Sequence, residues 1–381
     1  MDFLNHIITG SSLLLRGLSI FFVVMIIIFV HEIGHYLIGR WCGIRASVFS
    51  LGFGPQIIGY TDKNDTQWRL ALIPLGGYVK FVGDGEDVTS FRSSSVVEGS
   101  FANAHAWKKA LTVFAGPLFN GLFTVVILTF FFFFYGRVAI EPVVGSLVKD
   151  YPAIQSGLEV GDRFIEMDGR QVESFENLMN YVSLHGEDPI EFKIERMGRI
   201  FTTVITPKVI ERDDGFGNLV RSGMIGVGIP INPDNPAHLD PFYVKHIRYG
   251  FIRSVREAIE HATLIVNQTI FFIGRLIKGK GDYCQISGPS KTVKIAWKVS
   301  ERGFVSLLNF TAFLSISVGL INLFPLPPLD GGHLLFHVIE ALTGRQVSSP
   351  IRQIVFRLGF FVVLLFMFFA LFNDYFCWFS E

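Results

Sequence analysis

Four stretches of the chain are apolar over a length that can cross a lipid bilayer as a helix, which takes about 17–25 residues. The first extends from about Gly17 to Gly39 and is interrupted only by ionisable residues at positions 31, 32 and 35. The other three cover about Ala110–Tyr135, Phe304–Phe324 and Leu358–Phe372. The pattern predicts a polytopic α-helical membrane protein with about four transmembrane helices, the last of them short.

Between the second and third spans, the pattern changes to short β-rich runs separated by Gly-Asp and Asp-Gly turns. Predicted strands cover Val143–Val148, Arg163–Met167, Ile190–Arg196 and Thr202–Thr206, and predicted helices cover Ala153–Leu158 and Phe175–Leu184. Further along, apolar residues recur at helical spacing from Phe251 to Ile277, which predicts an amphipathic helix. We expect that helix to lie on a sheet or on the membrane surface rather than to bind substrate directly.

The loop between the first two spans has the pattern of a β-hairpin. Its two β-like stretches are Ser47–Phe53 and Trp68–Phe81, and the polar turn Thr61–Thr66 separates them. The segment Ala71–Leu75 is apolar although it lies between two spans. We therefore expect a membrane-associated hairpin, whose backbone must be satisfied by protein or water.

These patterns divide the chain into four parts. Residues 1–136 hold the first two spans and the hairpin, 137–210 the β-rich module, 211–303 a connector with the amphipathic helix, and 304–381 the C-terminal membrane part. Half of the 381 residues are hydrophobic and 17% are charged, which excludes a wholly soluble or a disordered chain. The 33 basic residues balance the 33 acidic ones, so no charge excess indicates nucleic acid.

The placement of lysine and arginine predicts the orientation of the spans, because basic loops stay in the cytoplasm. Arg16 alone precedes the first span, whereas eight basic residues lie between the first two spans. Arg345 and Arg352 lie between the third and fourth spans, and the tail from residue 373 has no basic residue. We therefore expect both termini and residues 137–302 on the outer side, with the two basic loops in the cytoplasm.

The strongest chemical signal is His31-Glu32-Ile33-Gly34-His35, inside the first span. Residues four apart share one face of a helix, so both imidazoles can reach one metal ion. Glu32 is placed to contact a water on that metal as a general base, as in the H-E-x-x-H pattern of metalloproteases. Because ionisable groups at bilayer depth need partners, a satisfied polar cluster between helices is the alternative interpretation.

A third metal ligand is needed, because catalytic zinc sites usually have three protein ligands and a water. Asp330 is the candidate, since it lies at the predicted cytoplasmic end of the third span and matches His35 in depth. His333 is a rival, although a role behind the ligands or on the surface explains it as easily. Prolines break the helix after residue 324, so Asn322 either binds substrate backbone or the oxyanion, or caps the broken helix.

These features resemble the site-2 protease family of intramembrane zinc peptidases, most closely its bacterial regulator-of-sigma-E protease branch. The resemblance rests on His31–His35, on the Asn-Pro-Asp-Gly run at 322–332 and on residues 137–210, whose text is similar to circularly permuted bacterial PDZ domains. Phe49–Gly54, Leu75–Lys80 and Gly116–Asn120 are similar to further family segments. The best-known members of the branch have two tandem PDZ domains, whereas this sequence shows one.

The resemblance implies a Zn²⁺ cofactor and a place in the bacterial inner membrane, with the active site toward the cytoplasm and the PDZ domain in the periplasm. It implies cleavage of single-span membrane proteins such as anti-sigma factors or signal-peptide remnants, after trimming by an upstream site-1-type protease. Membrane lipid is the other implied partner, and nucleic acid is not. PDZ domains bind peptides by strand addition, so the edge near Val143–Ser146 is expected to face a peptide.

Six residues form the expected substrate-binding set: Asn322, Gly52, Phe53, Gly54, Pro325 and Pro327. A helical substrate must be unwound before cleavage, and the strand Ser47–Phe53 or its hairpin partner could pair with the opened segment. In the implied mechanism, a zinc-activated water attacks the peptide bond and Glu32 carries its proton to the leaving amine. The alternative function is a non-catalytic membrane PDZ scaffold with a structural metal site, in which Glu32 would have no role.

Overall fold

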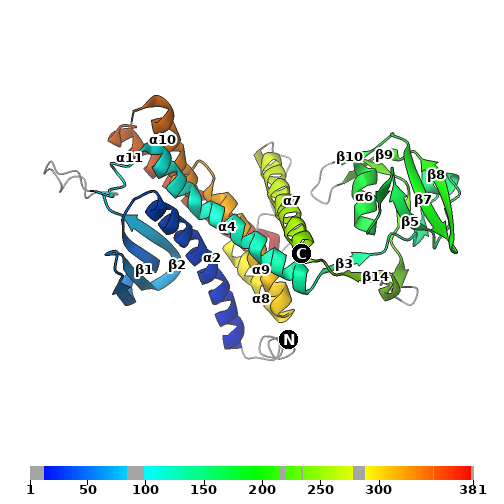
Figure 1. Cartoon of the computed structure of the whole chain (residues 1–381), viewed down its shortest axis with the longest axis horizontal. Coiled ribbons are helices and arrows are strands. Elements are labelled where there is room, and N and C mark those ends of the chain that lie inside the picture. The colour runs from blue at the N-terminus through cyan, green and yellow to red at the C-terminus, as the bar shows by residue number, and fades with distance from the viewer. Residues whose placement is uncertain are drawn as a thin grey trace. The chain divides into compact units, whose positions relative to one another are not determined.

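The computed structural model describes residues 13–83, 98–213, 219–232, 235–277, 288–345 and 347–378. The chain divides into two compact units, drawn in Figure 1. The membrane unit comprises Met1–Phe131, Phe251–Ile273 and Tyr283–Glu381, and the β-rich unit comprises Phe132–Gly250 and Gly274–Asp282. Each unit has its own hydrophobic core and is described by itself below.

Four helices are long and apolar enough to cross a membrane, as the sequence predicts. They are α2 (Leu13–Trp41), α4 (Ala106–Phe134), α9 (Phe304–Asn322) and α11 (Ser349–Trp378). The fourth span is longer than the predicted Leu358–Phe372, because the part of α11 that is suited to cross a membrane covers the 26 residues Pro350–Tyr375. The helix continues through Arg352 and Arg357, whose long side chains can extend along a helix toward water.

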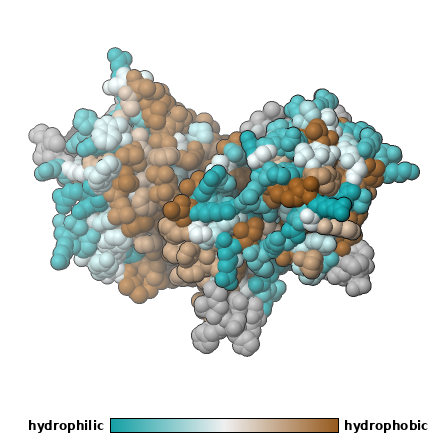
Figure 2. Space-filling view, turned by 45° about the vertical axis from the view of Figure 1, so that its right-hand side comes forward, coloured by the Kyte–Doolittle hydropathy of each residue, from teal (hydrophilic) through white to brown (hydrophobic). Residues whose placement is uncertain are grey.

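The surface of the membrane unit is apolar where these helices are exposed. Large apolar side chains that face outward include Phe21 and Phe22 of α2, and Leu365 and Phe366 of α11. Figure 2 shows such hydrophobic residues gathered over the helical part of the molecule. An apolar outer surface on membrane-length helices is typical of a protein that faces lipid.

The hairpin consists of two long, bent strands, β1 (Ala46–Thr61) and β2 (Gln67–Phe81). Strand β1 continues eight residues beyond the predicted end at Phe53, because Gly52 and Gly54 adopt positive φ angles and turn the chain without ending its pairing. Residues 48–51 pair with 77–80 on one side and with 67–70 on the other. Because both strands bend, they form a sheet of four antiparallel segments.

An aromatic cluster attaches this hairpin to α2, beside which it lies in Figure 1. Phe49 stacks on Trp68 at 4.3 Å between ring centroids, and Tyr36 of α2 meets Trp68 edge-on at 5.1 Å. At the hairpin turn, the indole N–H of Trp68 donates to Asp62 at 3.0 Å. This hydrogen bond, with those from the backbone of Thr66 and Asn64, lowers the pKa of Asp62 to about 2.

Three further helices complete the described part of the membrane unit. α10 (Asp330–Thr343) begins at Asp330, seven residues after α9, and α7 (Phe251–Ile277) coincides with the predicted amphipathic helix. The third, α8 (Pro289–Glu301), has its N-terminus capped by α11: the backbone N–H groups of Gly288 and Lys291 donate to Asp374 at 2.8 and 3.0 Å.

The β-rich unit is built on a sheet in the order β6-β5-β7-β8, with helix α6 beside it. The elements of this layer are β5 (Arg163–Met167), β6 (Arg170–Gln171), α6 (Phe175–Leu184), β7 (Ile190–Arg196) and β8 (Arg199–Ile205). Tight turns join β5 to β6 and β7 to β8, at Asp168-Gly169 and Met197-Gly198, where all four residues have positive φ. Such two-residue turns match the twist of antiparallel strands.

The remaining elements of this unit are short, and two of their four pairings join segments that are far apart in sequence. They are β3 (Arg137–Ile140), β4 (Ser146–Leu147), α5 (Pro152–Gln155), β9 (Lys208–Asp213), β10 (Leu219–Met224), β11 (Val227–Gly228), β12 (Ile231–Asn232), β13 (Asn235–Leu239), a 3₁₀ turn η1 (Pro241–Tyr243) and β14 (Val244–Ile247). Strand β14 pairs with β3, β9 with β10, β12 with β13 and β11 with β4. Two of these elements are shorter than predicted. Strand β4 covers two residues of the predicted Val143–Val148, and α5 ends before the predicted end of the helix at Leu158.

The structure differs from the sequence-based expectation at the end of this unit and at one strand edge. The predicted boundary at residue 210 falls within β9, and the hydrophobic core includes Ile225 and Val227 from beyond it. The expectation that the edge near Val143–Ser146 faces a peptide is wrong. Val144 exchanges backbone hydrogen bonds with the 161–162 segment, and Gly145 donates to Gly228 of β11, so both sides of that edge are occupied by the chain itself.

Candidate metal centre

Two histidines one helical turn apart form the first half of the site. His31 and His35 lie on α2, and each residue is only 8% exposed. Their Nε2 atoms are 3.2 Å apart, and the rings meet edge to face at 4.8 Å between centroids. The i, i+4 spacing therefore brings two metal-binding nitrogens to one point, as the sequence predicts from helical geometry.

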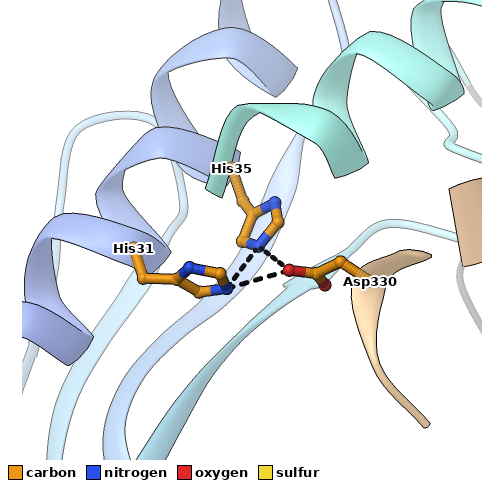
Figure 3. A group of neighbouring side chains, drawn as sticks. All are labelled: His31, His35 and Asp330. Carbon is orange, nitrogen blue, oxygen red and sulfur yellow. Dashed lines mark hydrogen bonds and ion pairs between the residues drawn. The ribbon is translucent and has the colours of Figure 1, made fainter. Parts of the chain in front are cut away.

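Asp330 supplies the other half of the site. It is the first residue of α10, and Figure 3 shows its carboxylate pointing at both imidazoles. Asp330 Oδ2 lies 2.9 Å from Nε2 of His31 and 3.4 Å from Nε2 of His35. These three residues are a group of possible metal ligands in the described part of the chain, and residues almost 300 positions apart thus meet at one point.

The three ligand atoms fit a zinc ion. A tetrahedral zinc with N and O ligands at about 2.0–2.2 Å separates its ligand atoms by about 3.3–3.6 Å, so separations of 2.9–3.4 Å need only a small outward movement. Asp330 Oδ2 is buried and faces both imidazole nitrogens, so the three donor atoms converge on one point. Two imidazoles and one carboxylate are a typical donor set for catalytic zinc, with a fourth position left for water.

Helix α4 packs against the back of both imidazoles. Nδ1 of His35 lies 2.9 Å from the backbone carbonyl oxygen of Thr112, and Nδ1 of His31 lies 3.3 Å from the side-chain amide of Asn120. Between them, a Cβ atom on Gly116 would overlap Nε2 of His35 and lie 2.9 Å from Cε1 of His31. The sequence marked Gly116–Asn120 only as a segment similar to the family, and it gave none of these three residues a role in the site.

Glu32 is buried beside this group without belonging to it. It is 8% exposed, and a Cβ atom on Gly77 of β2 would lie 2.9 Å from its Cγ. The same Cβ would lie 2.9 Å from the carbonyl oxygen of Ser50. Strand β2 therefore passes directly against the carboxylate-bearing residue, and the glycine permits that approach.

The rival ligand His333 is not part of the group. Its ring meets Phe356 of α11 edge-on at 4.8 Å, whereas the metal-ligand atoms that converge belong to His31, His35 and Asp330. His333 lies three residues after Asp330 on α10, and its ring packs against Phe356 of α11.

The expected substrate-binding residues separate into two places. Gly52, Phe53 and Gly54 lie at the bend of β1, where the Phe53 ring stacks on Tyr78 at 6.1 Å. Asn322 is the half-buried last residue of α9, and Pro325 is exposed in the loop before Asp330. Pro327 in that loop is buried, and Cβ atoms on Gly332 or Gly359 would overlap it, so it is tightly packed against α10 and α11.

The pairing of the hairpin decides which strand can accept another segment. Residues 48–51, within the expected pairing strand Ser47–Phe53, already have partners on both sides. Residues 77–79 pair with β1 on one side only in the described part of the chain. Of the two alternatives that the sequence left open, the hairpin partner is thus the one that has a side without a paired strand among the described residues, and its Gly77 lies against Glu32.

Comparisons with known proteins show the family to which this chain belongs. The family model described as peptidase family M50 matches residues 19–366. Two relatives are named "Putative zinc metalloprotease": one from Bartonella henselae, 77% identical over 93% of this chain and 100% of its own, and one from Brucella suis biovar 1, 42% identical over 96% and 97%. Metalloprotease MmpA of Caulobacter vibrioides is 30% identical over 95% of each chain.

Solved structures of PDZ domains also align with part of the chain. One of them is the PDZ domain of the SdrC-like protein from Listeria innocua, with 21% identity, a TM-score of 0.20, and coverage of 25% of this chain and 99% of its own.

Proposed function

The chain belongs to peptidase family M50, whose proteases use zinc, and from this premise we propose that it is an intramembrane zinc endopeptidase that cuts transmembrane segments of other membrane proteins. The observation that carries the proposal is the convergence of His31, His35 and Asp330 at a buried point on a membrane-length helix. Burying ionisable groups at that depth costs free energy unless the groups have partners. A bound metal would be a shared partner for all three side chains.

The protein groups around the metal have distinct tasks in this proposal. Zinc at this point would supply Lewis-acid chemistry, acidifying water and polarising the peptide carbonyl. Glu32 takes the proton of the attacking water and delivers it to the leaving amine. Asp330 and the two imidazoles hold the metal, while the carbonyl of Thr112 orients His35.

Substrate would be held in an extended conformation. A peptide bond within a helix is protected by its own hydrogen bonds, so the segment must open before cleavage. We propose that the opened segment pairs with β2 at residues 77–79, which pair with β1 on one side in the described part of the chain and whose Gly77 lies against Glu32. Asn322, at the end of α9 and close in sequence to Asp330, is proposed to hold the substrate backbone.

The proposed substrates are single-span membrane proteins such as anti-sigma factors or signal-peptide remnants, already trimmed by a site-1-type protease. The apolar surface of the four long helices supports access through lipid. The strand order of the β-rich unit supports a PDZ-type module that binds peptides on a sheet edge. Since β11 covers the edge first expected, the outer edge of β11 itself is the proposed peptide-binding strand.

The first prediction tests catalysis. Purified protein in lipid should cleave a trimmed single-span substrate, lose activity with a chelator and regain it with zinc. Glu32→Gln should keep one zinc per chain and lose at least about 10²-fold in rate, because general-base catalysis contributes 10²–10⁴-fold. Asp330→Asn, the matched change at a proposed ligand, should instead lower zinc affinity. Full activity of Glu32→Gln would contradict the mechanism, and zinc binding without cleavage by the unaltered protein would favour a PDZ scaffold.

The second prediction tests orientation in the bacterial inner membrane. The placement of basic residues supports a cytoplasmic hairpin loop and a periplasmic β-rich unit. With the native cysteines replaced, a cysteine at residue 168 should react with an impermeant reagent in cells with a permeabilised outer membrane, and a cysteine at residue 63 should not. Both positions lie in described turns outside the four long helices. The opposite labelling pattern would reverse the orientation.

A further inference from the structure

The side chain of Asn120 lies behind one of the proposed zinc ligands. Asn120 is fully buried on α4, and its Nδ2 atom lies 3.3 Å from Nδ1 of His31. Its Oδ1 atom is also buried and has no hydrogen-bond partner in the described part of the chain. A buried carbonyl without a donor is unfavourable, so this amide is not in its best-satisfied arrangement.

The chemistry of a metal-binding imidazole indicates which amide atom should face His31. His31 directs Nε2 toward Asp330 and His35. A neutral imidazole that binds a metal through Nε2 carries its hydrogen on Nδ1, and this N–H needs an acceptor. An NH₂ group can only donate, whereas a half-turn of the amide brings Oδ1 to the same position.

The second imidazole already has the corresponding arrangement. Nδ1 of His35 faces the backbone carbonyl oxygen of Thr112 at 2.9 Å, two turns earlier on α4. With Oδ1 of Asn120 turned toward His31, one helix provides an oxygen acceptor behind each of the two ligands. For His35 the backbone supplies it, but for His31 only a side chain is in place.

We propose that Asn120 is a positioning residue of the zinc site, whose side-chain carbonyl accepts a hydrogen bond from Nδ1–H of His31 and so holds that ring in its metal-binding tautomer and orientation. The proposal rests on the zinc site proposed above.

The test measures zinc affinity of the full-length protein in detergent, by competition with a chromophoric chelator. Asn120→Leu and Asn120→Ala remove the acceptor, and each should raise the dissociation constant for zinc by about 10–100-fold, the usual cost of losing such a partner. Asn120→Asp keeps an oxygen at this position and should stay within about threefold of the unaltered protein. Thr124→Val is the matched control: Thr124 is buried one turn further along α4 and donates to backbone oxygens of Asn120 and Ala312. It should leave zinc affinity unchanged.

The variants separate hydrogen bonding from packing. If Asn120 only fills space, Asn120→Asp should be at least as damaging as Asn120→Ala, and that result would overturn the proposal. Zinc affinity of Asn120→Ala equal to that of the unaltered protein would overturn it too. If the branched leucine prevents folding, Asn120→Ala still tests the loss of the acceptor. Thermal unfolding of each metal-free variant would show whether that variant folds. If the unaltered protein itself binds no zinc, the proposed function fails; if it binds zinc and cleaves while Asn120→Ala binds equally well, only the role of Asn120 fails.

Discussion

Gly116 sets how closely α4 can approach the proposed histidine ligands. A Cβ atom at this position would overlap Nε2 of His35, the atom that faces Asp330, and would come within 2.9 Å of His31. Helix backbones cannot shift cheaply in a close-packed interior, so the added atom must displace the imidazoles. The absence of a side chain at residue 116 is therefore part of the geometry of the site.

The third prediction follows from that contact. Gly116→Ala should lower zinc affinity by at least about tenfold, because it moves both rings away from Asp330. Gly121→Ala is the control on the same helix, since nothing lies within 4 Å of a Cβ there. It should keep zinc affinity and cleavage, although alanine favours a helix more than glycine does. Zinc affinity that is equal in the two variants would show that the rings adapt.

At the residue scale, what could be predicted depended on whether the side chain itself carries the chemistry. His31, Glu32 and His35 stand out because ionisable groups at helical spacing are rare in an apolar span. Asp330 could be inferred because few acidic residues lie at the end of a span. Asn120 and Thr112 could not, because their contribution is one oxygen atom directed at a ring on another helix, and no local pattern encodes that direction.

At the element scale, predictions succeeded where the pattern is local. Strands β5 and β7 and helices α6 and α7 have the predicted bounds, because apolar periodicity and turn residues define each of them within its own sequence. Strand β4 failed, because its length is set by pairing with β11, about 80 residues later. The bend of β1 was missed for a related reason: positive φ at Gly52 and Gly54 lets one strand pair with β2 on two sides.

An ion pair links two of these elements in the β-rich unit. Asp162, before β5, is only 1% exposed and accepts two hydrogen bonds at 2.7 Å from Arg196 at the end of β7. The same guanidinium donates to Glu159 and to the carbonyl of Gly157. Because Asp162 is buried, water cannot replace the hydrogen bonds from Arg196, whereas an exposed ion pair would contribute little.

The fourth prediction compares these two kinds of ion pair. Arg196→Met should destabilise the β-rich unit clearly more than the control below, since it leaves the buried Asp162 carboxylate without the two hydrogen bonds that Arg196 donates. Lys193→Met is the matched control on the same strand. Lys193 Nζ lies 3.3 Å from Glu166 Oε1, and both side chains are partly exposed. That change should cost less than about 1 kcal/mol. Protection of the sheet amides from hydrogen exchange would measure both, and equal effects would contradict the argument.

At the scale of the whole molecule, the main stretch of the β-rich unit, Phe132–Gly250, begins and ends near one paired ladder. β3 follows α4, β14 precedes α7, and the two strands pair from Arg137 with Ile247 to Ile140 with Val244. The proposed zinc ligands and Glu32 all lie in the membrane unit. A PDZ-type module binds peptides but supplies no acid, base or nucleophile, so we expect it to control which substrates approach rather than to take part in the reaction.

The fifth prediction is that the β-rich unit can be removed without loss of the zinc site. A deletion of residues 143–241, closed by a flexible linker, keeps the β3–β14 ladder and includes Ile225 and Val227, which belong to the core that is removed. Zinc content should be unchanged, and a trimmed single-span substrate should still be cut. Cleavage of an untrimmed substrate with a bulky outer domain should rise, although modestly, since one such module excludes less bulk than two would. A deletion protein that binds zinc normally and cuts neither substrate would show that the unit belongs to the working site.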